Sequence, residues 1–169
     1  MQTQSEAFTN NATPYAVREL VCIFRPARDH EERIVQAVSI ALTDARAAVR
    51  VLGPFLADQA VETFGVACIS AKYRLLAWHV LSRGTRGTTL ISIPDVFVPA
   101  CVTPGTVALL VAHNHPSGDP TPSPDDVALT RRLLAAADIL DVTLFDHLIV
   151  GEDQRYFSFR EHGLVELTP

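Results

Sequence analysis

Runs of hydrophobic residues, separated by short polar segments, follow one another along the chain. Six of these runs are four to eight residues long and rich in β-branched and aromatic residues, which is typical of strands. The run at 106–112 is continuous and apolar, so we expect a central strand buried on both faces. The predicted strands are 17–24, 63–69, 75–81, 106–112, 143–150 and 156–159, the second and third joined as a hairpin.

Three helices are predicted between these strands. The first covers 43–57, with Thr43 as its N-cap, and the second runs from Pro94 to about Val102. The third follows a stiff loop at 116–124, where four prolines exclude a helix. The order of strands and helices predicts an α/β domain, a mixed β-sheet with flanking helices. The apolar side of the third helix is formed by Val127, Leu129, Leu133, Leu134, Ala137 and Leu140.

Composition agrees with one folded domain and a short N-terminal addition. The chain has 169 residues, of which 48% are hydrophobic and 20% charged, enough for a buried core and unlike a disordered chain. We interpret 1–12 as a flexible tail, 13–42 as an N-terminal strand and connector, and 43–169 as the main domain.

The charge pattern narrows the classes of partner. The net charge is −5, and the 13 arginines and one lysine are not gathered into a stripe, so no nucleic-acid surface is visible in the sequence. The longest aliphatic run is too short to span a membrane. The start of the chain lacks the pattern of a secretory signal, so we expect a cytoplasmic protein.

Three widely spaced cysteines fit neither a disulfide framework nor a zinc knuckle, and each is expected to be buried: Cys22, Cys68 and Cys101.

Two histidines at the end of the 106–112 strand are the first sign of chemistry. His113 and His115 are two residues apart, so both imidazoles leave the same face and can converge on one ion. Alone this signal is weak, because paired histidines near a strand end are often plain loop residues. Ser123 stands eight residues after His115, and Asp126 follows three residues later.

Ser123 and Asp126 also fit the start of a helix. A serine N-cap, Pro124 in the first helical position and an acid in the first turn are explained by capping alone. Capping does not exclude metal binding, because a first-turn carboxylate points toward the preceding loop, which begins at the histidines. Two imidazoles and one carboxylate leave one zinc position for water, as in hydrolytic rather than structural zinc sites.

Such a site also needs a general base outside the metal's ligands. Glu62, at the entry of the 63–69 strand, is the upstream acid best placed for this role. Asp58 and Asp95 are its competitors.

The spacing of these residues resembles the JAMM motif of MPN-fold metalloproteases. Glu62 stands fifty-one residues before His113, and Ser123 and Asp126 follow the histidines at the motif's intervals. The surroundings are similar to the RadC family, and the resemblance covers about 43–163. The segments that carry it are 64–66, 83–85, 113–123, 129–133, and Asp146-His147 with Gly151.

The resemblance implies a fold, a metal and a reaction. The fold is an MPN (JAB) domain with cytidine-deaminase-like layering. One Zn²⁺ per chain is held by His113, His115 and Asp126, with Glu62 as general acid and base and Ser123 steadying the oxyanion. Water then cleaves a peptide or isopeptide bond of a peptide or protein substrate. Asp125 adjoins Asp126 as an alternative ligand, but the motif's spacing selects Asp126.

Two other functions stay open. One is a nucleic-acid enzyme or binding protein, because the RadC family carries a DNA-repair label. Full-length members have a helix-hairpin-helix region ahead of the catalytic domain, and the roughly forty residues here are too few for it. The other is a non-catalytic scaffold braced by zinc. For His147 a hydrogen-bonded pair with Asp146 is favoured over a place behind the zinc site, and the oligomeric state is not determined.

Overall fold

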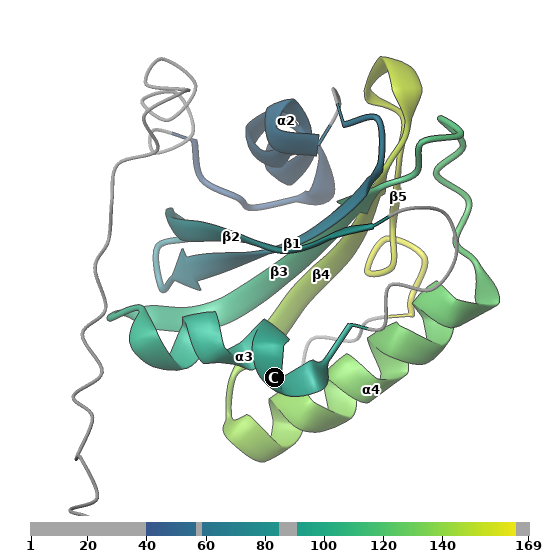
Figure 1. Cartoon of the computed structure of the whole chain (residues 1–169). Helices are drawn as coiled ribbons and strands as arrows, with labels where there is room; N and C mark the ends of the chain where they lie inside the picture. Colours follow the sequence, from purple (N-terminus) through teal and green to yellow (C-terminus); the bar gives the residue numbers. More distant parts are fainter. Residues whose placement is uncertain (1–39, 57–58, 85–90, 165–169) are drawn as a thin grey trace, which may run out of the picture.

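A five-stranded sheet forms the middle layer of the protein, with α2 on one face and α3 and α4 on the other (Figure 1). The structure is a computed structural model that describes residues 40–56, 59–84 and 91–164. In chain order the elements are α2 (Ala45–Leu56), β1 (Glu62–Ser70), β2 (Leu75–Gly84), α3 (Ile93–Val102), β3 (Thr106–Asn114), α4 (Pro124–Leu140), β4 (Thr143–Val150), the 3-10 helix η1 (Glu152–Gln154) and β5 (Tyr156–Ser158).

The sheet is mixed, and β3 lies at its centre. The strand order is β2-β1-β3-β4-β5, with β1 antiparallel to both β2 and β3. β3 and β4 are parallel and are connected through α4, and β5 returns antiparallel to β4. The uninterrupted apolar run of β3 is buried from Ala108 onward, which confirms the prediction of a central strand. The predicted α/β class and mixed sheet with flanking helices are also confirmed.

Successive side chains of β1 and β3 point to opposite faces of the sheet, so the core has two layers, one on each face. Even residues of β3 such as Leu110 pack toward α2, and odd residues such as Val111 pack toward α3 and α4. In β1 the residues facing α3 and α4 are Phe64, Val66 and Cys68. His113 continues the odd series of β3, and Glu62 continues the Phe64 series of β1. The sheet therefore directs both residues to the α4 side.

Some sequence predictions need correction. The first helix begins at Ala45, because Asp44 Oδ1 rather than Thr43 accepts the capping bond from the Ala47 N–H, at 2.7 Å. Cys68 is buried as expected, but Cys101 is exposed because it lies on the outer side of α3 with Val98. Tail 1–12, strand 17–24, Cys22 and most of the connector 13–42 lie outside the described residues.

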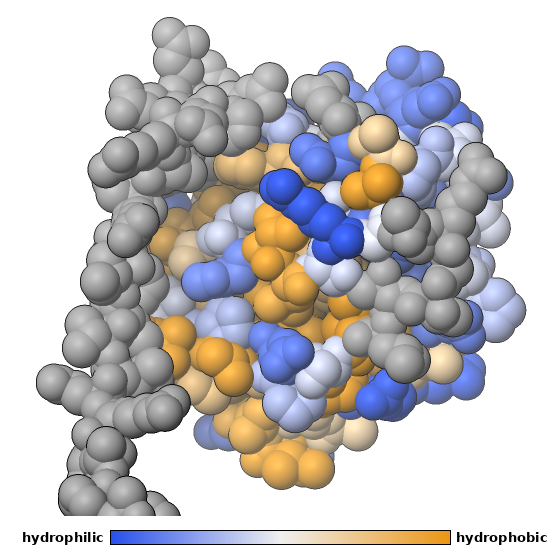
Figure 2. All heavy atoms as spheres, viewed as in Figure 1, coloured by the Kyte–Doolittle hydropathy of each residue, from blue (hydrophilic) through white to orange (hydrophobic). Residues whose placement is uncertain are grey.

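Apolar side chains also reach the surface. Figure 2 shows them over the middle of this view, between the parts formed by α2 and α3. Leu76 and Val80 of β2 are both exposed, and β2 forms one edge of the sheet. Within the described ranges, every helix is too short or too polar to cross a membrane.

A buried carboxylate ties β4 to β5 and to the turn that follows. Asp146 accepts hydrogen bonds from the Ser158 hydroxyl at 2.6 Å and from the N–H groups of His147 and Arg160 at 2.7 and 3.0 Å. Burial raises the pKa of Asp146 to about 6, although these hydrogen bonds act to lower it. Asp146 therefore holds Ser158 of β5 and the backbone at Arg160 against the strand that carries His147.

Asp146 is expected to make the protein less stable as the pH rises from 4 to 7. Its pKa is higher in the folded state than the ordinary value of about 3.9, so protonation stabilises the fold below about pH 4, and this contribution is lost as the pH passes about 6. Relative to Asp146→Asn, the wild-type free energy of unfolding should fall by about 2 kcal/mol over this range. Urea unfolding at both pH values measures it, and parallel curves for the two proteins would contradict the assignment.

Candidate metal centre and active site

Three side chains, from the end of β3, the residue just after it and the first turn of α4, meet at one point. His113 Nε2 lies 3.1 Å from His115 Nε2 and 3.3 Å from Asp126 Oδ1, and His115 Nε2 lies 3.6 Å from Asp126 Oδ2. Two ligands bound tetrahedrally to zinc, at bond lengths of about 2.0 to 2.2 Å, are about 3.3 Å apart. The donor set and its spacing therefore fit a zinc ion. Among the described residues, the one cluster of this kind is His113, His115 and Asp126.

The end of β3 and the start of α4 position these three side chains. His113 is buried beneath α4 and stacks on Phe64, its register partner in β1, with ring centroids 5.7 Å apart. His115 follows the strand directly and is partly exposed. Asp126 lies in the first turn of α4, where the Ser123 N–H and hydroxyl donate to its Oδ2 at 2.8 and 2.6 Å. The sequence thus builds the site where β3 ends and the next helix begins.

The loop after the histidines fixes the orientation of His115. Its Nδ1 lies 2.8 Å from the carbonyl oxygen of Asp119, which can only accept, so Nδ1 carries the proton and Nε2 keeps its lone pair for a metal. Gly118 has φ +76°, and its carbonyl accepts from Arg155 at 3.0 Å. A side chain at Gly151 would collide with that carbonyl. The first part of the predicted stiff loop is therefore held by hydrogen bonds from His115 and Arg155.

Charge inside the cluster favours a bound cation. Partial burial raises the pKa of Asp126, but His113, His115 and the Ser123 hydroxyl together lower that pKa far below its usual value. The Asp126 carboxylate in turn raises the pKa of His115, against the effect of burial. Asp126 is therefore ionised, and protons and a metal compete for His115.

Glu62 opens onto the same cleft as the cluster. The cleft is lined by Glu62, His115, Ser123 and Asp126, together with Arg132 and other residues of α4. The charge of Glu62 also contributes to the raised pKa of His115. Among its competitors, Asp95 is exposed in the first turn of α3 and Asp58 lies outside the described residues. Asp125 lines the cleft but does not join the three donor atoms.

Asn114 is a residue of the site for which the sequence predicted no role. It points away from its two histidine neighbours, and its Oδ1 accepts from the Thr63 N–H at 2.8 Å. Its Nδ2 donates to the carbonyl oxygens of Gln59 and Val61, both at 3.2 Å. Asn114 thus binds the backbone on both sides of Glu62 and fixes the entry of β1 beside His115.

Ser123 forms the helix cap that the sequence predicted. Besides donating to Asp126, its Oγ accepts from the Asp126 N–H at 3.2 Å, so the two residues form a reciprocal capping box. Its side chain also lines the cleft beside Glu62 and His115. The capping box accounts for the main-chain bonds between the two residues, and the Ser123 hydroxyl donates in addition to Asp126 Oδ2. A role of Ser123 in catalysis stays a proposal.

His147 is hydrogen-bonded to Asp146, as the sequence favoured, but through its main-chain N–H and not through its imidazole. Adjacent strand residues point to opposite faces, so Asp146 bonds only the main-chain N–H of His147. The His147 imidazole instead lies 3.1 Å from His113 Nδ1 and 2.6 Å from Thr130 Oγ1. Burial lowers the pKa of His147 well below its usual value. The His147 imidazole therefore lies directly behind the cluster of His113, His115 and Asp126.

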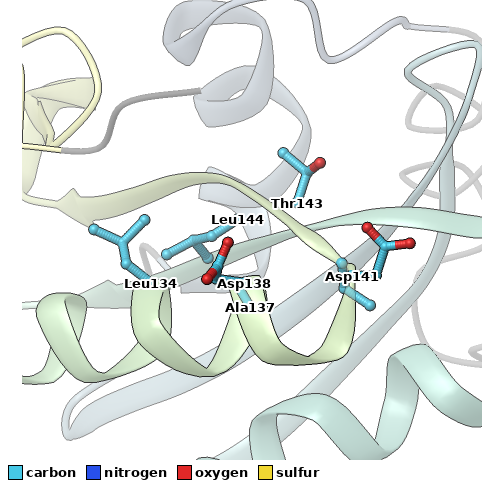
Figure 3. A pocket seen from close by; sticks show the side chains of 7 residues that line it. Leu134, Ala137, Asp138, Asp141, Thr143 and Leu144 are labelled. Carbon is cyan, nitrogen blue, oxygen red and sulfur yellow. The ribbon is translucent and has the colours of Figure 1, made fainter. Parts of the chain in front are cut away.

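A second pocket lies at the other end of α4 (Figure 3). Asp138, in the last turn of the helix, and Asp141, its C-cap, line this pocket together with the apolar side chains of Leu134 and Leu144. Asp138 and Asp126 are twelve residues apart in α4, which is about 18 Å along the helix axis. The pocket lining has no histidine, and the group of described residues that could hold a metal ion lies at the N-terminal end of α4.

Comparisons with known proteins agree with this geometry. A family model for the RadC-like JAB domain matches residues 42–164. A UPF0758 protein of Symbiobacterium thermophilum is 40% identical over 124 residues, which are 73% of this chain and 52% of that protein. A UPF0758 protein of Porphyromonas gingivalis is 39% identical over 124 residues, which are 73% of this chain and 54% of that protein. A UPF0758 protein of Trichormus variabilis is 45% identical over 115 residues, which are 68% of this chain and 46% of that protein.

The chain spans about half the length of the curated relatives it matches. The family match includes β1, β3, the proline-rich loop and α4, which together carry every residue of the metal cluster and Glu62. By this match, and by its five-stranded mixed sheet with helices on both faces, the chain belongs to the RadC-like JAB domain family.

Proposed function

We propose that this chain is a zinc-dependent metallohydrolase that cleaves a peptide or isopeptide bond in a peptide or protein substrate. The observation that carries the proposal is the convergence of His113, His115 and Asp126 beside a cleft that Glu62 also lines. Three protein donors leave a zinc position for water, which is the arrangement of catalytic zinc. When bound, zinc would lower the pKa of a water molecule and polarise a carbonyl group.

Residues of the chain transfer the protons of the reaction and hold the reacting groups in place. Glu62 takes a proton from the attacking water while the water oxygen bonds to the carbonyl carbon of the substrate. Glu62 then delivers that proton to the departing amine as the carbon–nitrogen bond breaks. Ser123 lies on the cleft wall, and its one hydroxyl proton turns from Asp126 Oδ2 to the developing oxyanion. Asn114 holds Glu62 in place through the backbone on either side of it.

One experiment separates this reaction from its rivals. The zinc-loaded protein is incubated with a peptide mixture and with single- and double-stranded DNA, alongside Glu62→Gln, and the products are analysed by mass spectrometry. We expect peptide cleavage by the wild type alone. DNA cleavage that disappears in Glu62→Gln would indicate a nucleic-acid enzyme. Tight zinc binding with no cleavage of either substrate would indicate a scaffold.

Ser123 allows its two roles to be separated by substitution. Ser123→Ala should cost about 1 kcal/mol of stability through loss of the cap, whereas Ser123→Gly should cost only a few tenths, since glycine is tolerated at this position. Either change removes the hydroxyl from the oxyanion, and loss of one such donor typically lowers turnover by about 10² to 10³.

The glycine variant is therefore the informative one. It should melt close to the wild type and bind zinc normally while its turnover falls. Thermal unfolding, zinc titration and peptide hydrolysis measure the three properties on the same preparation. Near-normal turnover would reduce Ser123 to a helix cap.

A further inference from the structure

We propose that Thr130 and His147 are positioning residues that hold His113 in the one tautomer able to bind a metal through Nε2. This inference rests on the proposed role of His113 as a metal ligand. Both residues lie behind the cluster, out of reach of a substrate in the cleft.

A continuous line of hydrogen bonds connects the Asp126 carbonyl, through Thr130 and His147, to the imidazole of His113. Thr130, one turn after Asp126 in α4, donates its hydroxyl to the Asp126 carbonyl oxygen at 2.6 Å. The same hydroxyl lies 2.6 Å from His147 Nδ1, and His147 Nε2 lies 3.1 Å from His113 Nδ1. All three side chains are buried. The line therefore runs from the main chain of one metal ligand to the imidazole of another.

The Asp126 carbonyl sets the direction of every proton in this line. A carbonyl oxygen can only accept, so the single hydroxyl proton of Thr130 points to it. Thr130 Oγ1 must then accept from His147, which places the His147 proton on Nδ1. With Nε2 of His147 left as an acceptor, His113 must donate from Nδ1, and its Nε2 lone pair faces His115 and Asp126.

The opposite proton order would disable His113. If Thr130 donated to His147, then His147 would donate from Nε2 to His113 Nδ1. The proton of a neutral His113 would then occupy Nε2, the atom that must bind the metal. This order also leaves two oxygens 2.6 Å apart, those of Thr130 and the Asp126 carbonyl, with no proton between them.

Packing keeps His147 in the place that this order requires. Its ring stacks on Phe159 with centroids 4.7 Å apart and planes 9° apart, and it meets the edge of Phe64 at 5.9 Å. The ring is wholly buried, and burial disfavours a second proton, because a charge in these apolar surroundings is costly. His147 is therefore held as a neutral acceptor toward His113.

His115 is controlled separately. It donates from Nδ1 to the Asp119 carbonyl within its own loop, whereas His113 lies inside the sheet and depends on Thr130 through His147. Loss of the Thr130 hydroxyl should therefore change His113 and leave His115 as it is.

The test combines nitrogen NMR of the metal-free chain with zinc affinity measured by chelator competition. In the wild type, long-range proton–nitrogen spectra should show His113 and His147 protonated on Nδ1. Thr130→Val, which keeps the shape but removes the hydroxyl, should abolish this pattern and weaken zinc binding by about 10- to 100-fold. Thr130→Ser should restore both properties. Thr103→Val, at a buried threonine before β3, is the matched control and should change neither.

Each outcome decides a separate question. Wild-type His147 protonated on Nε2, or normal zinc affinity in Thr130→Val, would overturn the inference while leaving the metal site intact. A wild type that binds no zinc would refute the proposed function, and the wild-type nitrogen spectrum would still decide the tautomers. If Thr130→Val fails to fold, the wild-type spectrum and Thr130→Ser keep the inference testable.

Discussion

Replacing Asp126 by asparagine is expected to weaken zinc binding by more than about 100-fold, whereas Asp125→Asn leaves the affinity unchanged. The loss of a residue that supports a metal ligand typically costs 10- to 100-fold, and loss of a ligand itself costs more. Asp126 lies 3.3 Å from His113 Nε2, while Asp125 stands outside the cluster. Asparagine keeps an oxygen that can accept from the Ser123 N–H, so the cap of α4 is retained.

Chelator competition on the two purified variants measures this difference, and thermal unfolding checks that both are folded. The variants have the same change of charge at neighbouring positions, so a general electrostatic effect would weaken zinc binding in both. Normal affinity in Asp126→Asn together with loss in Asp125→Asn would show that the other carboxylate is the ligand.

Glu62→Gln is expected to lower turnover on the peptide substrate by about 10² to 10⁴, the usual contribution of general acid–base catalysis. Glutamine has nearly the same shape but cannot take a proton from water. Glu62 is not among the three donor atoms of the cluster, so zinc affinity and stability should stay near those of the wild type. This combination distinguishes a proton-transfer role from a structural one.

Turnover, zinc affinity and melting temperature are compared in Glu62→Gln, Asp95→Asn and Asp58→Asn. Only the first variant should lose activity. If Glu62→Gln kept most of its turnover while Asp95→Asn or Asp58→Asn lost it, the base would be one of these aspartates.

The elements of the fold were largely predictable because their signals are local. The continuous apolar run of β3 and the prolines of the loop before α4 placed the central strand and the helix start within a few residues. The N-cap of α2 was misplaced by one residue, because Thr43 and Asp44 are both good caps and only the backbone geometry decides between them. The exposed Cys101 shows that a residue type alone does not tell which side of a short helix it occupies.

The candidate site was predictable where spacing carries it. The two-residue interval of His113 and His115 and the helix-start pattern at Asp126 follow from strand and helix geometry, so their convergence could be expected. The contacts of Asn114, Thr130 and His147 join elements far apart in the sequence, and no periodicity reports them. The choice of Glu62 over Asp58 and Asp95 came from the family resemblance and the strand position, and the shared cleft supports it.

The most direct test of an open, catalytic zinc site is diffraction at the zinc absorption edge from crystals of the zinc-loaded protein. We expect one anomalous peak per chain, from a zinc ion bonded to His113 Nε2, His115 Nε2 and an Asp126 oxygen, with a solvent oxygen in the fourth position on the side of Glu62. A peak at any other place would contradict the metal site. A fourth protein ligand closing the coordination shell would contradict catalysis and make the zinc structural.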